Sequence, residues 1–181
     1  MKHLVEPIKS KKDIETVEEY LACKSLRNRL IFVFGINTGL RISDILALNV
    51  RDVLQKNNVE IKEKKTGKYK SFPLNNKIKN LLKEYLKEKD INEPLFLGKK
   101  RKRLDRSQVY RFLNEACKEV GLTINVGTHT MRKTFGFFFY KKFNDIALLQ
   151  KILNHSSPAI TLRYIGIAQE EIDISYKQFE L

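Results

Sequence analysis

Apolar residues recur every three or four positions along most of the chain, which places them on one face of a helix. In the first quarter this spacing predicts helices from Ser10 or Asp13 to about residue 23, over 26–38 and over 43–48. Gly39 is expected to end the second of these in a left-handed conformation. Beyond residue 74 the same spacing predicts helices over about 75–89, 107–120, 128–143, 145–153 and 169–179. A further short helix, capped by Ser156 or Ser157 with Pro158 in its first turn, is expected to carry Tyr164 near its end.

The pattern changes between about residues 52 and 74. Turn signals at Asn57-Asn58 and Thr66-Gly67 separate short segments over 59–61 and 69–72. These segments predict a small antiparallel meander. The predicted fold class is therefore mainly α with a small antiparallel β-sheet (α+β).

Composition narrows the class of protein. The chain has 181 residues and 42% hydrophobic residues, which predicts a single domain with its own core. We expect a flexible lead-in over about 1–10 and a C-terminal tail helix over about 167–181. The longest apolar run, at 31–36, is too short for a bilayer, and Cys23 and Cys117 form no CxxC motif. We expect no membrane role, and we expect the protein to reside in a reducing cytoplasm.

The net charge of the chain indicates what kind of partner it binds. Lys and Arg number 35 against 21 Asp and Glu, a formal net charge of +14. An excess of this size favours a polyanion such as DNA, because each neutralised phosphate releases counterions.

Candidate catalytic residues lie at three predicted helix boundaries. Arg41 follows a helix stop, His129 and Arg132 share one face at a helix start, and His155 lies at a break nine residues before Tyr164. Arginines clamp phosphate oxygens bidentately, and histidines move protons near neutral pH. A tyrosine hydroxyl has an ordinary pKa near 10, so it attacks well only beside cations or a base.

Five segments together closely resemble the catalytic signature of the tyrosine recombinase (phage integrase) family, including its Xer-type members. In order, they are 38–46, the basic hairpin 65–68, 129–132, 153–157 and Tyr164. The resemblance covers almost the whole chain and implies the tyrosine recombinase catalytic-domain fold.

The resemblance also implies roles. Arg41 and Arg132 would bind the scissile phosphate, and Lys65 would protonate the leaving 5′-oxygen. His129 and His155 would hydrogen-bond the phosphate and assist proton transfer.

Tyr164 would form a 3′-phosphotyrosyl intermediate, which conserves bond energy and needs neither metal nor ATP. We therefore expect no cofactor and no metal site. The expected function is site-specific DNA recombination on double-stranded DNA carrying a specific site. A tetramer would form on DNA, and a monomer or weak oligomer without it. We expect a bacterial or phage-encoded, cytoplasmic protein associated with the nucleoid.

Several positions differ from the usual family pattern or leave alternatives open. Asn154 stands where a glycine often precedes the second histidine, and Lys133 where a histidine often follows the second arginine. Asp44 is either a helix-start residue or a support for an arginine. About 25 residues precede the first core helix, too few for the family's N-terminal DNA-clamping domain, so the chain is either a fragment or naturally short. The tail helix packs either in cis or on a neighbouring subunit.

Other basic residues are candidate DNA contacts, or else solvated surface. Lys68 is also the second choice for the general acid. These candidates are Lys68, Lys70, Lys99, Lys100, Arg101, Lys102 and Arg103.

Two other functions remain open from the residues. A type IB topoisomerase shares the chemistry and would relax supercoils without exchanging partners. A DNA-binding regulator with an inactive catalytic domain would not need Tyr164.

Overall fold

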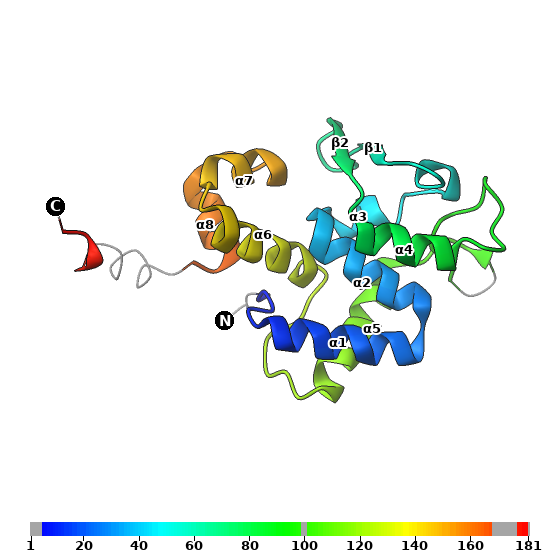
Figure 1. Ribbon diagram of the computed structural model, residues 1–181, viewed down its shortest axis with the longest axis horizontal. Coiled ribbons are helices and arrows are strands. Elements are labelled where there is room, and N and C mark those ends of the chain that lie inside the picture. Colours follow the sequence, from blue (N-terminus) through cyan, green and yellow to red (C-terminus); the bar gives the residue numbers. More distant parts are fainter. Residues whose placement is uncertain (1–4, 99–100, 168–176, 181) are drawn as a thin grey trace.

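A computed structural model describes residues 5–98, 101–167 and 177–180. The described residues are mainly helical and include a two-stranded antiparallel sheet, which confirms the predicted class (Figure 1). The helices are α1 (Lys11–Lys24), α2 (Leu26–Thr38), α3 (Ile42–Ile45), α4 (Asn76–Tyr85), α5 (Arg106–Glu119), α6 (Thr130–Phe143), α7 (Ile146–Leu153) and α8 (Pro158–Ile165), with a 3-10 turn, η1 (Val50–Asp52).

Side-chain caps explain where several helices begin. The Ser10 hydroxyl accepts the N–H of Asp13, and the Ser25 hydroxyl accepts the N–H of Asn28. Each cap satisfies a backbone donor that has no partner inside the helix. Gly39 ends α2 with φ 62°, in the predicted left-handed conformation. The observed helices start and stop within a few residues of the predicted boundaries.

The sheet is a single hairpin of β1 (Asn58–Lys62) and β2 (Tyr69–Pro73), shorter than the predicted meander. Val59 lies opposite Phe72, and both are buried. The Phe72 ring contacts the Phe34 ring of α2 edge-on, with 6.2 Å between ring centres. One face of the hairpin is therefore anchored to the core, and its turn carries Lys65.

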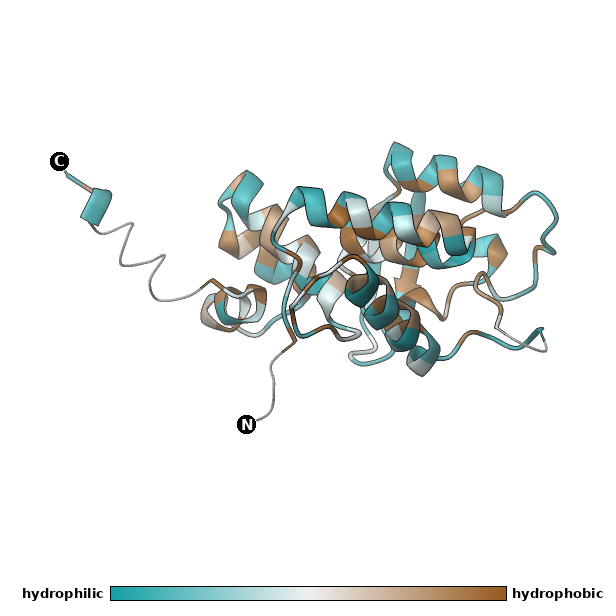
Figure 2. Ribbon diagram, turned by 90° about the horizontal axis from the view of Figure 1, so that it is seen from below, coloured by the Kyte–Doolittle hydropathy of each residue, from teal (hydrophilic) through white to brown (hydrophobic). Residues whose placement is uncertain are grey.

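The core is arranged around α2, which packs against α1, α4, α5 and α6. Residues 30–35 are buried on every side of this helix, and no polar stripe interrupts them. A second apolar cluster joins Leu149, Leu153 and Ile165 of α7 and α8 to α6. Helix α6 thus links the two halves of the molecule (Figure 1), and Figure 2 shows most helices with one hydrophobic and one hydrophilic side.

Residues 5–10, predicted to be a flexible lead-in, make specific contacts with the rest of the fold. Ile8 is buried, and its N–H donates to Thr134 Oγ1 at 2.9 Å. Lys9 Nζ donates to the carbonyl of Gly166 at 3.0 Å. These contacts hold the segment between α6 and α8. The predicted tail helix lies mostly outside the described residues.

Within the described ranges, no helix combines the length and the apolar character that crossing a bilayer requires.

Gly39 is a test of this packing. A Cβ there would lie 2.4 Å from the Phe135 ring, on a backbone with positive φ. We expect Gly39→Ala to lower the free energy of unfolding by about 2–4 kcal/mol, from backbone strain plus a clash. Gly121 also has positive φ but open space around it, so Gly121→Ala should cost only about 1 kcal/mol. Urea unfolding measures both, and equal losses would contradict the predicted clash.

Candidate active site

Arg132 lies in the first turns of α6 and is 2% exposed. Its Nη1 donates to the carbonyl of Gly39, and its Nη2 donates to the carbonyl of Leu153. Both carbonyls stand at helix C-terminal ends, where backbone acceptors lack partners inside the helix. One guanidinium therefore joins the ends of α2 and α7 to the start of α6.

Tyr164 is placed on α8, which begins after Ser157 with Pro158 in its first turn. Its hydroxyl lies 3.1 Å from His129 Nδ1. The ring meets the His155 ring edge-on, with 4.8 Å between ring centres. The Lys133 ammonium lies 5.0 Å from the centre of the same ring. Histidines from two separate motifs thus flank the tyrosine.

His155 follows Asn154, which ends α7 in a left-handed conformation at φ 51°. Its Nδ1 lies 3.1 Å from Thr161 Oγ1 on α8. Burial, followed by the charges of Arg132 and Arg41, lowers the pKa of His155 to about 4. Its imidazole is therefore neutral at physiological pH in the free protein.

Tyr164 and His129 are poised for proton transfer. Burial raises the pKa of Tyr164 above its ordinary value, although the charges of Arg132 and Arg41 oppose this effect. Burial and the same arginines lower the pKa of His129. A protonated phenol therefore faces a neutral imidazole, which can accept its proton.

Arg41 forms an ion pair with a residue that the sequence interpretation missed. Arg41 Nη1 lies 2.9 Å from Glu63 Oε1, although the two groups are not aligned for a hydrogen bond. Glu63 Oε2 accepts from Thr66 Oγ1 at 2.6 Å and from Asn154 Nδ2 at 3.1 Å. Burial acts to raise the pKa of Glu63, but these hydrogen bonds and the Arg41 charge outweigh it and lower the pKa.

Lys65 lies on the exposed turn of the β1–β2 hairpin. Its charge contributes to the lowered pKa of both His129 and His155, after burial and the arginines. The backbone N–H of the preceding residue, Lys64, donates to Asp44 Oδ1 at 3.0 Å. Asp44 is buried, so it holds the turn rather than only starting α3.

Lys68 and Lys70 both reach the end of α7. Lys68 Nζ donates to Asn154 Oδ1 at 3.2 Å, and Lys70 Nζ donates to the carbonyl of Ile152 at 3.0 Å. Burial, followed by the charge of Arg132, lowers the pKa of Lys70 to about 8. In the free protein these lysines attach the hairpin to the turn that carries His155. Their predicted role in binding DNA stays a prediction.

Of the basic residues over 99–103, those that the structure describes form a free surface only in part. Arg103 donates to the carbonyls of Leu46 and Leu48 at 2.7 and 2.9 Å, so it supports the chain after α3. Arg101 pairs with Glu93 at 3.1 Å, while Lys102 is exposed. The first two candidates of the run, Lys99 and Lys100, lie outside the described residues.

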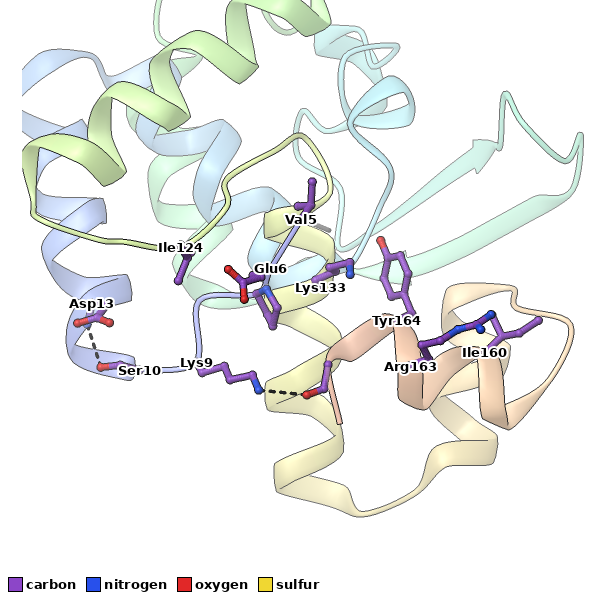
Figure 3. Close-up of a pocket in the computed structure, with 12 residues that line it drawn as sticks. Val5, Glu6, Lys9, Ser10, Asp13, Ile124, Lys133, Ile160, Arg163 and Tyr164 are labelled. Atoms are coloured by element: carbon purple, nitrogen blue, oxygen red, sulfur yellow. Dashed lines mark hydrogen bonds between the residues drawn. The ribbon is translucent and has the colours of Figure 1, made fainter. Parts of the chain in front are cut away.

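The structure thus brings Arg41, Arg132, His129, His155 and Tyr164 together, with Lys65 on the neighbouring turn. A cavity of about 790 Å³ lies beside the tyrosine ring, between the N-terminal segment and α8 (Figure 3). Lys133 and Arg163 line it with Tyr164. Across the described ranges, no three His, Cys, Asp or Glu side chains are grouped closely enough to hold a metal ion.

The chain resembles known proteins in both sequence and structure. The model of the Phage integrase family matches residues 9–171. The probable integrase/recombinase YoeC of Bacillus subtilis (strain 168) is 47% identical over 178 residues, 98% of each chain. Tyrosine recombinase XerA of Saccharolobus solfataricus is 28% identical over 170 residues, covering 93% of this chain and 56% of XerA.

Among solved structures, the XerH site-specific recombinase bound to palindromic difH substrate, in a post-cleavage complex, superposes with a TM-score of 0.75. It is 25% identical, with coverage of 97% of this chain and 52% of that one. The chain therefore spans nearly all of YoeC but about half of these Xer recombinases.

The neutral state of His155 makes stability depend on pH. Between its folded pKa of about 4 and its ordinary value of 6.5, the unfolded chain binds the proton more readily than the folded protein. Stability is therefore lost as pH falls through this range. We expect His155→Gln to reduce the difference between the urea midpoints at pH 7 and pH 5. An unchanged difference would contradict the neutral assignment.

Arg132→Lys should cost both stability and activity, because lysine cannot span two carbonyls with one planar fork. We expect the free energy of unfolding to fall by about 2 kcal/mol or more, as one buried carbonyl loses its donor. DNA cleavage should be lost even where the variant remains folded. Arg111→Lys, on an exposed position of α5, is the matched control and should change neither.

Proposed function

The chain belongs to the phage integrase family as a tyrosine recombinase catalytic domain, and we propose that Tyr164 of this chain cuts and rejoins DNA at specific sites. The observation that carries this assignment is the position of the Tyr164 hydroxyl, 3.1 Å from His129 Nδ1 and beside His155. Arg132 and Arg41 act on the same hydroxyl through their charges. The proposed nucleophile thus lies beside its proposed proton acceptor and near the cations proposed to bind phosphate.

In the proposed reaction, the Tyr164 oxygen attacks the scissile phosphorus and its proton passes to His129. A phosphorus–oxygen bond forms to tyrosine as the bond to the 5′-oxygen breaks, and Lys65 gives that oxygen a proton. Attack of a 5′-hydroxyl on the phosphotyrosine then reverses these steps. The number of phosphodiester-type bonds stays constant, so the exchange needs no external energy source.

Arg132 and Arg41 would hold the non-bridging oxygens. Two N–H groups of Arg132 are committed to the carbonyls of Gly39 and Leu153, which orients the remaining donors. A guanidinium carries five donors in a fixed plane, so it can support the fold and still bind an anion. This pre-organisation favours the transition state, where charge builds on those oxygens.

Assembly follows from the symmetry of the target. XerH was solved on a palindromic difH substrate, and a palindrome offers two equivalent half-sites to two protein copies. Exchange between two such sites would engage four copies, so we propose a tetramer on double-stranded DNA. The net charge of +14 supports binding to the phosphate backbone, as expected for a protein acting on the nucleoid of a bacterial cell.

Covalent trapping tests the proposal. A pool of nicked duplexes with randomised sequence around the nick loses its short 5′-hydroxyl fragment after cleavage, so the protein stays attached. We expect the purified chain to form complexes that survive SDS and enrich particular sequences, because religation is blocked. Tyr164→Phe removes only the nucleophilic oxygen and serves as the control. Equal trapping by this variant, or none by wild type despite DNA binding, would contradict the proposal.

A further inference from the structure

We propose that Glu63 is a positioning residue that fixes Arg41 and aligns it with the turns carrying Lys65 and His155. This inference rests on the proposed function, since it concerns the same reaction. Glu63 is the one acidic residue among the lysines of 62–65, it directly follows β1, and it is 2% exposed. A carboxylate so deeply buried is costly unless positive charge and hydrogen bonds offset its desolvation.

The two carboxylate oxygens have separate partners. Oε1 lies 2.9 Å from Arg41 Nη1 in an ion pair, and neither atom has a hydrogen-bond partner among the described residues. Oε2 accepts from Thr66 and Asn154 at 2.6 and 3.1 Å. Because Oε2 is held from two sides, the carboxylate keeps its negative charge beside Arg41, and the ion pair restricts where the guanidinium can lie.

The partners of Oε2 connect Arg41 to the other catalytic groups. Thr66 follows Lys65 directly in the hairpin turn, and Asn154 precedes His155 directly at the end of α7. Asn154 also accepts from Lys68 through its Oδ1 at 3.2 Å, which ties the same two turns a second time. The asparagine thus takes part in a bridge that a glycine at this position would not form.

Glu63 does not face the Tyr164 hydroxyl in any described contact, so its effect would pass through Arg41 and the two turns. Displacement of a positioned group by about 1 Å can slow a reaction by as much as about 100-fold. Glu63→Gln keeps the shape of the side chain and removes the charge that pairs with Arg41. Glu60→Gln removes a carboxylate from an exposed position of the same strand and is the matched control.

The experiment uses the duplex enriched by covalent trapping and measures single-turnover cleavage, gel-shift affinity and thermal unfolding. We expect Glu63→Gln to slow cleavage by about 10–100-fold while DNA affinity stays within about threefold. Glu60→Gln should stay within about twofold of wild type in both. Wild-type cleavage rates for a folded Glu63→Gln protein would overturn the inference and leave the proposed function intact. Failure of wild type to cleave any duplex would instead overturn the proposed function.

A double-mutant cycle separates positioning from general loss of structure. If Glu63 acts mainly through Arg41, Glu63→Gln should slow an Arg41→Lys protein by less than about threefold, far less than it slows wild type. Equal factors in both backgrounds would overturn the route through Arg41.

If the Glu63→Gln protein does not fold, Thr66→Val tests the same inference. This variant should fold, because Thr66 is exposed and valine keeps the side-chain shape. The carboxylate would lose one of the two hydrogen bonds that hold Oε2, and we expect cleavage to slow by about 3–10-fold with unchanged DNA affinity. An unchanged cleavage rate would overturn the inference.

Discussion

The buried guanidinium of Arg132 is the constraint on which the site depends. A charge at 2% exposure is tolerable only where acceptors surround it, and the chain supplies the carbonyls of Gly39 and Leu153. Arg41 follows Gly39 by two residues, and His155 follows Leu153 by two. Satisfying one arginine therefore sets the starting points of the two turns that carry the candidates Arg41 and His155. Helix α6, which carries Arg132, packs against α2 in the core. The packing of the fold therefore determines the geometry of the site.

The same concentration of positive charge prepares the site for an anion. Burial and the charges of Arg132 and Arg41 lower the pKa of His155 to about 4, and burial with Arg132 lowers that of Lys70 to about 8. Lowered pKa values of this kind gather at functional sites, and the two guanidiniums beside these groups offer donors of the kind that bind phosphate. Glu63 offsets part of this charge and is held by neutral donors on its other oxygen. The balance favours neutral histidines beside a protonated Tyr164.

Local signals predicted much of this structure, and contacts between distant segments account for the rest. The helix starts at Ser10 and Ser25 and the stop at Gly39 follow from caps that operate within four residues. The order of the N-terminal segment depends on a bond from Ile8 to Thr134, which no local pattern reports. The motifs identified the catalytic candidates by order and spacing. The burial of Glu63 depends instead on contacts with Arg41, the hairpin turn and the end of α7, which are distant in sequence. In the sequence, the only indication of a paired carboxylate was its position among lysines.

The central claim is that Tyr164 becomes the covalent link to DNA. It is tested most directly by digesting the trapped complex with nuclease and trypsin and locating the nucleotide by mass spectrometry. Trypsin cleavage after Arg163 and Lys177 releases a peptide that contains both Tyr164 and Tyr176, so the fragments provide an internal comparison. The account predicts a nucleotide attached through its 3′-phosphate to Tyr164, with Tyr176 unmodified. Attachment at Tyr176 or at any other residue would contradict it.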